Sequence, residues 1–240
     1  MTVRFLLSGD TAVTVEFGDR IDRVLSEAVL RLNAFVRAAN LPGVVETVPT
    51  FRSLAVHYDP LATDSGDLIP AIEKLIDGGR GDRKQSNLWR VPACYATSHA
   101  PDLADVARRT GLSTNEIVRL HSGTRFHIYM LGFAPGFPYM GDLPEAIVLP
   151  RRNDPRTRVP AGSIAIAAGM TAVYPVESPG GWHLIGATPI RLFDPRWPRP
   201  ALFNPGDTVR FEPISGREFD AIRAAVAADA YHVPCETVAA

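Results

Sequence analysis

The densest concentration of residue types suited to ligand binding lies between Gly132 and Gly186. It begins with a glycine- and proline-rich run that supplies four candidate substrate contacts, Pro135, Gly136, Phe137 and Tyr139. Glycine lets a backbone approach a ligand closely, and proline stiffens a loop so that little entropy is lost on binding. The same composition is typical of tight corners in a β-barrel, so this run alone leaves both interpretations open.

Four arginines follow within eight positions, Arg151, Arg152, Arg156 and Arg158. Guanidinium groups bind carboxylate and phosphate oxygens in pairs, so the block could form a clamp for an anionic substrate. Arg151 and Arg158 are candidate catalytic groups, and Arg156 is a candidate substrate contact. The alternative is that the block forms ordinary ion pairs with nearby acids, namely Asp142, Glu145 and Asp154.

A second turn, from Ser178 to His183, would place backbone amides, an indole and an imidazole close together. Gly180, Gly181 and Trp182 are therefore candidate substrate contacts, as is Ser163. His183 is a candidate catalytic group, because imidazole titrates near neutral pH. A turn with a packed tryptophan and a histidine in the core is the simpler alternative.

Several other kinds of site are not supported by the sequence. It contains no Walker-type phosphate loop, no dinucleotide-binding glycine motif, no HExxH pair and no GxSxG elbow. The last lysine is Lys84, so the rest of the chain offers no biotin-accepting or Schiff-base lysine. We therefore expect no metal site and no biotin, PLP or NAD.

Charge and hydropathy restrict the partners and the compartment. The formal net charge of -1 disfavours nucleic acid, which is held largely by excess positive charge. No leader-like N-terminal segment and no long apolar run are present, and Cys94 and Cys235 lie far apart. These features predict a cytoplasmic protein without a disulfide framework.

The elements that must position these residues fall into two groups. Residues 1–80 predict a small α+β domain, in which two amphipathic helices pack on one face of an antiparallel sheet, as in a ferredoxin-like sandwich. Residues 81–90 are polar and predict a linker. Residues 91–240 predict two short helices, many short strands and a C-terminal helix. The expected strands include 146–149 and 190–193, and Ser113 with Glu116 predicts a helix-capping box.

Four ordered blocks of sequence then resemble one known family. They are YMLGFAPGFPYMGDLP, PRRNDPRTRVPAGSIAIA, YPVESPGGWHLIGATPIRLFDP and NPGDTVRFEPI. The chain is similar in these blocks to the KipI family, also called allophanate hydrolase subunit 1, and within it most closely to the B subunit of 5-oxoprolinase. The resemblance covers about residues 91 to 214, and the preceding segment fits the smaller N-terminal domain of the family in length and pattern.

The resemblance implies a cyclophilin-like β-barrel after an α/β N-terminal domain. It also implies a complex with two further proteins: a C subunit, of the KipA or allophanate hydrolase subunit 2 type, and an A subunit, of the LamB/YcsF type. Such a complex hydrolyses 5-oxoproline to glutamate with ATP, and with Mg²⁺ at the level of the complex; this chain would be inactive alone. Two alternatives from the same family are a KipI-type inhibitor of a histidine kinase and an allophanate hydrolase component that acts on a urea-like amide.

Two positions depart from the usual pattern of the family. Met170 stands where the family tends to have glutamine, and Ala187 stands where it usually has arginine. Both changes remove hydrogen-bond donors from the expected cleft. The exact substrate therefore does not follow from the resemblance, whereas the fold does.

Overall fold

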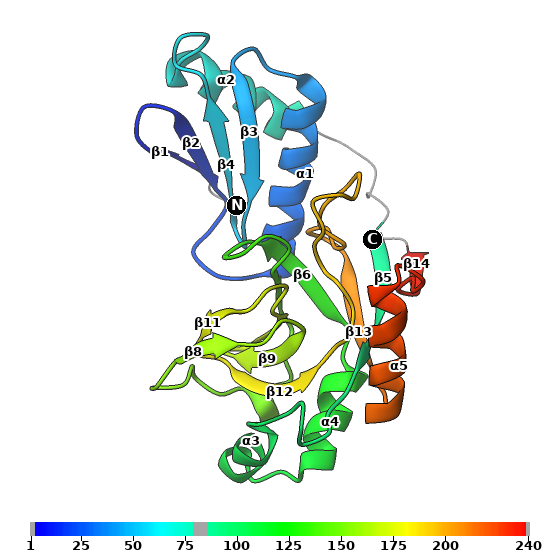
Figure 1. Ribbon diagram of the computed structural model, residues 1–240. Helices are drawn as coiled ribbons and strands as arrows, with labels where there is room; N and C mark the ends of the chain where they lie inside the picture. Colours follow the sequence, from blue (N-terminus) through cyan, green and yellow to red (C-terminus); the bar gives the residue numbers. More distant parts are fainter. Residues whose placement is uncertain (1–2, 79–85, 239–240) are drawn as a thin grey trace. The chain divides into compact units, whose positions relative to one another are not determined.

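The computed structural model describes residues 3–78 and 86–238. The chain divides into two compact units, Met1–Lys84 (unit 1) and Gln85–Ala240 (unit 2) (Figure 1). In both units, helices accompany an extensive sheet, so the fold is mixed α/β.

Unit 1 contains a four-stranded antiparallel sheet with the order β1-β2-β4-β3. Its strands are β1 (Arg4–Leu7), β2 (Ala12–Glu16), β3 (Val44–Pro49) and β4 (Ser53–Tyr58). Since β4 lies between β2 and β3, the path from β2 through a helix to β3 is a split β-α-β unit.

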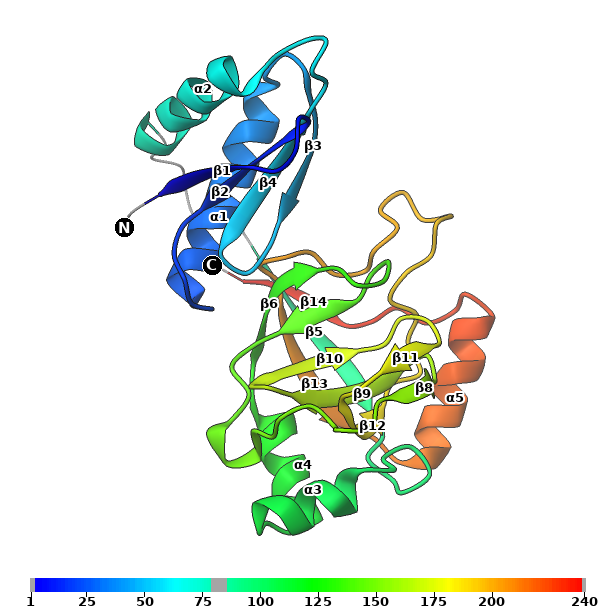
Figure 2. The same cartoon turned by 90° about the vertical axis from the view of Figure 1, so that its left-hand side faces the viewer.

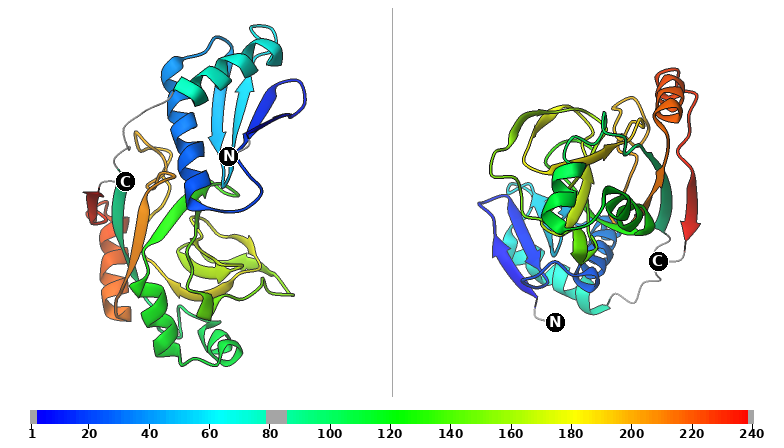
Figure 3. Two further views of the ribbon diagram at one scale, coloured as in Figure 1. Left: turned by 180° about the vertical axis from the view of Figure 1, so that it is seen from behind. Right: turned by 90° about the horizontal axis from the view of Figure 1, so that it is seen from below.

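Two helices, α1 (Arg23–Ala39) and α2 (Ser65–Gly78), lie on one side of this sheet (Figure 3, left). The carboxylate of Asp22 accepts hydrogen bonds from the backbone N–H groups of Val24 and Leu25, which fixes the start of α1. The apolar stripe of α1, including Val29 and Leu32, is buried in the core of this unit, as its helical spacing predicted.

Unit 2 is built on an eight-stranded sheet with the order β12-β9-β10-β7-β6-β13-β5-β14 (Figure 2). The strands are β5 (Ser86–Ala93), β6 (Phe126–Leu131), β7 (Pro138–Met140), β9 (Ser163–Ala167), β10 (Met170–Val173), β12 (His183–Ala187), β13 (Thr208–Pro213) and β14 (Cys235–Val238). A small second sheet pairs β8 (Arg156–Val159) with β11 (Ser178–Gly180).

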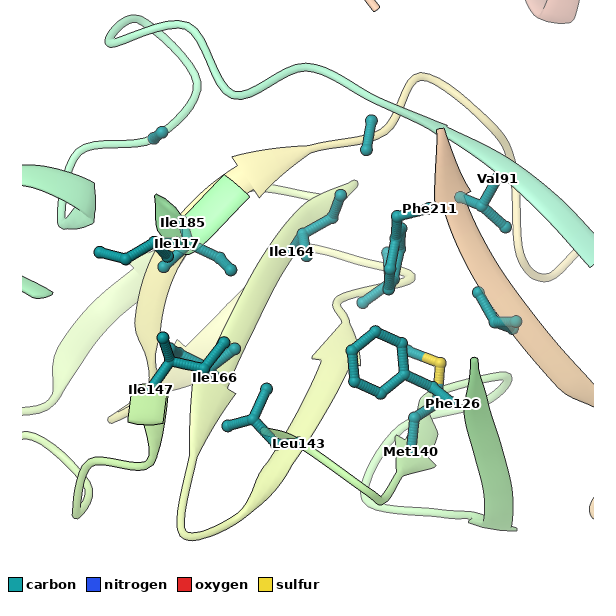
Figure 4. Packing of buried hydrophobic residues seen from close by; sticks show 14 of the residues in the cluster. Val91, Ile117, Phe126, Met140, Leu143, Ile147, Ile164, Ile166, Ile185 and Phe211 are labelled. Carbon is teal, nitrogen blue, oxygen red and sulfur yellow. The ribbon is translucent and has the colours of Figure 1, made fainter. Parts of the chain in front are cut away.

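The large sheet closes on itself at one point. Cys94, directly after β5, exchanges two backbone hydrogen bonds with Ala187 at the end of β12, with N···O distances of 2.8 and 2.9 Å. The closed sheet surrounds the main core, which contains Ile164 and Ile166 of β9 together with aromatic side chains such as Phe126 and Phe211 (Figure 4). This closure lets a sheet of short strands enclose one continuous core.

The helices of unit 2 are α3 (Leu103–Thr110), α4 (Thr114–Gly123) and α5 (Gly216–Ala227), with a 3-10 turn η1 (Glu145–Ile147). The predicted capping box of Ser113 and Glu116 is confirmed at the start of α4. None of the helices in the described residues is long and apolar enough to cross a membrane.

Three local predictions are wrong. Residues 146–149 do not form a strand, because 145–147 turn as η1 and bury Ile147 in the main core. Residues 190–193 form no strand, and only Phe193 makes an isolated bridge, to Ala201.

The third prediction concerns the linker, of which residues 86–90 belong to β5. Their polar composition has another cause: Arg90, for example, pairs with Glu236 on β14 and with Glu212 on β13. Residues 81–85 lie outside the described part of the chain.

A buried histidine connects α4 to β10. His121 is fully buried, and its ring stacks on Phe211 with 4.7 Å between the centroids. The hydroxyl of Thr171 donates to the carbonyl of Ala165, so it accepts from His121 Nε2–H at 2.9 Å. His121 Nδ1 then accepts from the hydroxyl of Tyr95 at 2.8 Å, which makes a directed chain of neutral groups.

This chain of hydrogen bonds predicts a pH dependence of stability. Burial lowers the pKa of His121 to about 3, whereas an unfolded histidine titrates near 6.5. Below pH 6.5 the unfolded state therefore binds a proton that the folded state excludes, and stability is lost as the pH falls toward 3, by up to about 1.4 kcal/mol per pH unit. Urea unfolding at pH 7, 6, 5 and 4.5 measures the slope.

His121→Gln should flatten this slope, even though loss of the stacked ring lowers its stability at pH 7. His57→Gln is the matched control, because His57 is exposed on β4. Equal slopes in the wild type and His121→Gln would contradict the assignment.

Candidate functional site

Four aromatic side chains of unit 2 form one group, which we call the aromatic cluster: Phe137, Tyr139, Tyr174 and Trp182. Phe137 stands edge-on to Tyr174, with 5.1 Å between ring centroids, and lies 5.0 Å from Tyr139 and 6.3 Å from Trp182. Tyr139 and Trp182 are 6.1 Å apart. The segment with Phe137 and Tyr139 thus meets a later segment that contains Tyr174 and Trp182.

Small residues of the large sheet make room for these rings. Along β9, Ile164 and Ile166 point into the main core, whereas Ala165 and Ala167 point toward the aromatic cluster. Side chains alternate between the two faces of a strand, so this Ile/Ala pattern gives one strand a bulky face and a flat face. The flat face supports the aromatic cluster.

Arg151 adds a positive charge to the aromatic cluster. Its guanidinium carbon lies 6.0 Å from the centroid of the Trp182 ring, and its side chain is exposed. Burial raises the pKa of Tyr139 and of Tyr174, although the nearby charge of Arg151 acts in the opposite direction. Both phenols therefore stay protonated at neutral pH and can donate hydrogen bonds.

Two glycines are required by close approaches around the aromatic cluster. A Cβ at position 180 would overlap the hydroxyl oxygen of Tyr174, so only glycine fits there. Gly136 has a φ of 76°, and a Cβ there would lie 2.8 Å from Cβ of Phe193. Gly136 therefore forms a tight corner in the loop before β7, which is one of the two interpretations that the sequence left open. Gly180 lets β11 pack directly against Tyr174.

A buried carboxylate holds the arginine block. Asp102, only 4% exposed at the start of α3, accepts from Arg156 Nη2 at 2.6 Å and from Arg152 Nη1 at 3.2 Å. Its second oxygen accepts from the backbone N–H of Leu184 at 2.7 Å. A carboxylate this buried needs such partners, and together they tie the segment before β8 to α3 and β12.

The arginines do form ion pairs, but with acids other than those expected. Arg152 and Arg156 contact Asp102, and Arg158 contacts Glu177 on the surface at 2.9 Å. Of the three acids expected to pair with the block, Asp154 contacts Arg152, and it does so through its backbone oxygen, 3.3 Å from Nε. The pairing of Asp102 with the block was invisible in the sequence, because the partners lie 50 or more residues apart.

The three predicted catalytic groups do not converge. Arg151 lies at the aromatic cluster, whereas Arg158 is exposed beside Glu177. His183 is fully buried, with Nε2 at 3.0 Å from the carbonyl of Pro150 and Nδ1 without a partner among the described residues. Since Leu184 packs in the aromatic cluster and Ile185 in the main core, strand alternation places His183 on the core side.

The predicted substrate contacts are divided in a similar way. Phe137, Tyr139 and Trp182 meet in the aromatic cluster, and Gly180 covers Tyr174. Pro135 is exposed in the loop before them, and Ser163 is buried at the start of β9. Gly181 accepts a hydrogen bond from the backbone of Arg152 at 2.8 Å.

Two residues central to this arrangement were missed. Tyr174 is the first residue of the third family-like block, but it was not chosen as a site residue, because its type and local spacing indicated no chemistry. Asp102 gave no usable signal, because nothing local distinguishes it from a surface acid. In addition, no group of three or more His, Cys, Asp or Glu within residues 3–78 and 86–238 could hold a metal ion.

Met170 and Ala187, the two positions that depart from the usual pattern of the family, lie in different surroundings. Met170 packs against the aromatic cluster, so the missing glutamine would have been close to it. Ala187 packs with Cys94 and Phe219 at the point where the sheet closes. Only the first departure therefore alters the surroundings of the candidate site.

Comparison with known proteins gives consistent matches. The family model described as carboxyltransferase domain, subdomain C and D, matches residues 3–203. The chain is 35% identical to the B subunit of 5-oxoprolinase from Bacillus subtilis, covering 93% of this chain and 98% of that protein. It is 39% identical to the B subunit of 5-oxoprolinase from Escherichia coli O157:H7, covering 88% and 95% respectively.

A solved structure supports the fold. The urea carboxylase of Kluyveromyces lactis superimposes with a TM-score of 0.79 at 20% identity, covering 98% of this chain and 24% of that one. The resemblance seen in the four sequence blocks is confirmed, and the chain belongs to the family of the carboxyltransferase domain, subdomain C and D.

Proposed function

We propose that this chain is the B subunit of an ATP-dependent 5-oxoprolinase, which acts with the A and C subunits to hydrolyse 5-oxoproline to glutamate. The observation that carries the proposal is the match to the B subunit of 5-oxoprolinase from two bacteria over nearly the whole of each protein. Both of these relatives are named as subunits, which supports a multi-subunit enzyme. We place this enzyme in the cytoplasm, with ATP and Mg²⁺ bound at the level of the complex.

The aromatic cluster suits the substrate of this reaction. 5-Oxoproline carries a carboxylate and a lactam carbonyl, whose oxygen receives the phosphoryl group in an ATP-dependent reaction. The exposed guanidinium of Arg151 is suited to the carboxylate, and the half-buried, protonated phenol of Tyr139 is suited to the lactam oxygen, whereas Tyr174 is buried beneath Gly180. Phe137 and Trp182 are buried, at 2% and 6% exposed, and support Tyr139 from within the aromatic cluster.

The role of ATP in such a reaction follows from the chemistry of amides. A lactam is a poor electrophile, and transfer of a phosphoryl group from ATP to its oxygen makes the carbon reactive. Water then adds to the carbon, the C–N bond breaks to give the amine, and a second water releases phosphate from the acyl phosphate. This chain's part is to hold and orient the substrate.

We also infer the finer fold assignments from these features. The bridge between Cys94 and Ala187, which closes the large sheet, supports a cyclophilin-like barrel in unit 2. The split β-α-β unit with both helices on one face supports a ferredoxin-like sandwich in unit 1.

Reconstitution tests the function. The purified chain is combined with the A and C subunits, and glutamate and ADP are measured after addition of 5-oxoproline and ATP. We expect ADP release that depends on 5-oxoproline and that stops when this chain is omitted. A stable complex that turns over a urea-like amide but not 5-oxoproline would contradict the substrate, and absence of any complex would favour a regulatory protein.

Arg151→Gln tests the substrate contact. Loss of a hydrogen bond between charged groups should raise KM for 5-oxoproline about 10- to 100-fold, with a smaller effect on kcat. Arg223→Gln is the matched control, because Arg223 is exposed on α5 and pairs with Asp220 in the same helix. Equal kinetic constants in Arg151→Gln and the wild type would place the carboxylate elsewhere.

Gly180→Ala tests the packing of the aromatic cluster. The added methyl group must displace Tyr174 or β11, so the free energy of unfolding should fall by about 1–3 kcal/mol, and activity should fall with it. Gly181→Ala is the neighbouring control, because its Cβ would lie 3.6 Å from Pro155, an ordinary contact. The measurements are urea unfolding and turnover of both variants. Similar losses of stability and activity in both would show that overlap with Tyr174 is not the cause.

A further inference from the structure

Unit 2 also contains a cavity that shares no residue with the aromatic cluster. Its volume is about 680 Å³, which is within the range of small-molecule sites. It lies between the segment around residues 190–202, the end of α5 and the C-terminal strand β14 with its partner β5. Nothing in the reaction proposed for the aromatic cluster uses it.

Aromatic rings supply much of the wall of this cavity. Trp89, Trp197, Tyr231 and His232 all line it. The indole of Trp89 is held in place, because its Nε1–H donates to Asp207 at 3.0 Å and its ring meets Phe203 edge-on at 5.6 Å. Flat rings along the wall, of which Trp89 is fixed by these contacts, favour a flat aromatic ligand that can stack on them.

Two oriented arginines provide the polar part of the cavity. Asp194, only 5% exposed, accepts from Arg196 at 2.9 and 2.6 Å and from Arg191 at 2.8 Å. Both arginine side chains line the cavity and keep further N–H donors, because a guanidinium has five. They are therefore fixed before any ligand arrives.

The charges of this cavity are balanced. Arg191 also lies 3.3 Å from Asp229, so two arginines face two carboxylates. Such a wall does not attract a strongly charged group, but its oriented N–H donors suit neutral acceptors such as ring nitrogens. The preferred ligand is thus flat, aromatic and rich in hydrogen-bond acceptors.

We propose that this cavity binds the adenine base of an adenine nucleotide. The step from a flat aromatic base to adenine rests on the proposed function, since an ATP-dependent reaction supplies this base. Stacking on Trp197 and hydrogen bonds from Arg196 hold the base, and the phosphates are left to other parts of the complex.

The test is equilibrium binding to the full chain on its own, with adenosine, ADP and tripolyphosphate as probes in calorimetry. Adenosine and ADP should bind with similar affinity and compete, whereas tripolyphosphate should not compete. Trp197→Ala should weaken adenosine binding about tenfold or more, as for loss of a base-stacking ring. Trp197→Phe should keep most of the affinity, and Arg223→Gln, outside the cavity, should keep all of it.

Three results would overturn the proposal: no binding of adenosine, binding unchanged in Trp197→Ala, or competition by tripolyphosphate alone. Thermal unfolding of each variant shows whether a loss comes from misfolding, and Trp197→Phe keeps the test valid if Trp197→Ala unfolds. The binding assay contains neither 5-oxoproline nor the other proteins of the complex. Failure of the reconstituted reaction with intact adenosine binding would therefore reject the proposed function but not the cavity.

Discussion

The arrangement of unit 2 depends on a strand that is buried on both faces. Every residue of β9 is buried, with isoleucines on one face and alanines on the other. The bulky face fills the core inside the closed sheet, and the flat face leaves space for four aromatic rings. A larger residue at Ala165 would have no room without displacing a ring of the aromatic cluster, so the size of these side chains fixes where the candidate site can be.

The charge of Asp102 adds a second constraint. A carboxylate that is 4% exposed is costly to bury, and two guanidiniums with one backbone N–H offset that cost. The same contacts fix the segment that begins at Arg151 and place it beside Trp182. The clamp suggested by the spacing of the arginines is therefore divided: Arg152 and Arg156 bind Asp102, and Arg151 extends over Trp182 of the aromatic cluster.

The sequence predicted most of the elements but fewer of the contacts. Amphipathic spacing and capping residues are local signals, so α1, α4 and the box at Ser113 could be recognised directly. Apolar runs near Ile147 and Ile190 resembled strands, yet they bury their side chains in a 3-10 turn and in irregular chain, which an apolar run alone does not distinguish. Tyr174 and Asp102 were missed because their roles depend on residues far away in the sequence.

The composition of the aromatic cluster limits the chemistry that its side chains can perform. Its ionisable members are two phenols, with arginines beside them, and burial raises the pKa of both phenols. Such groups donate hydrogen bonds at neutral pH, but they do not accept a proton from water. His183, the imidazole nearest in sequence, lies on the core side of β12. Within the reaction proposed for this family, the aromatic cluster is therefore suited to binding the substrate rather than to activating water.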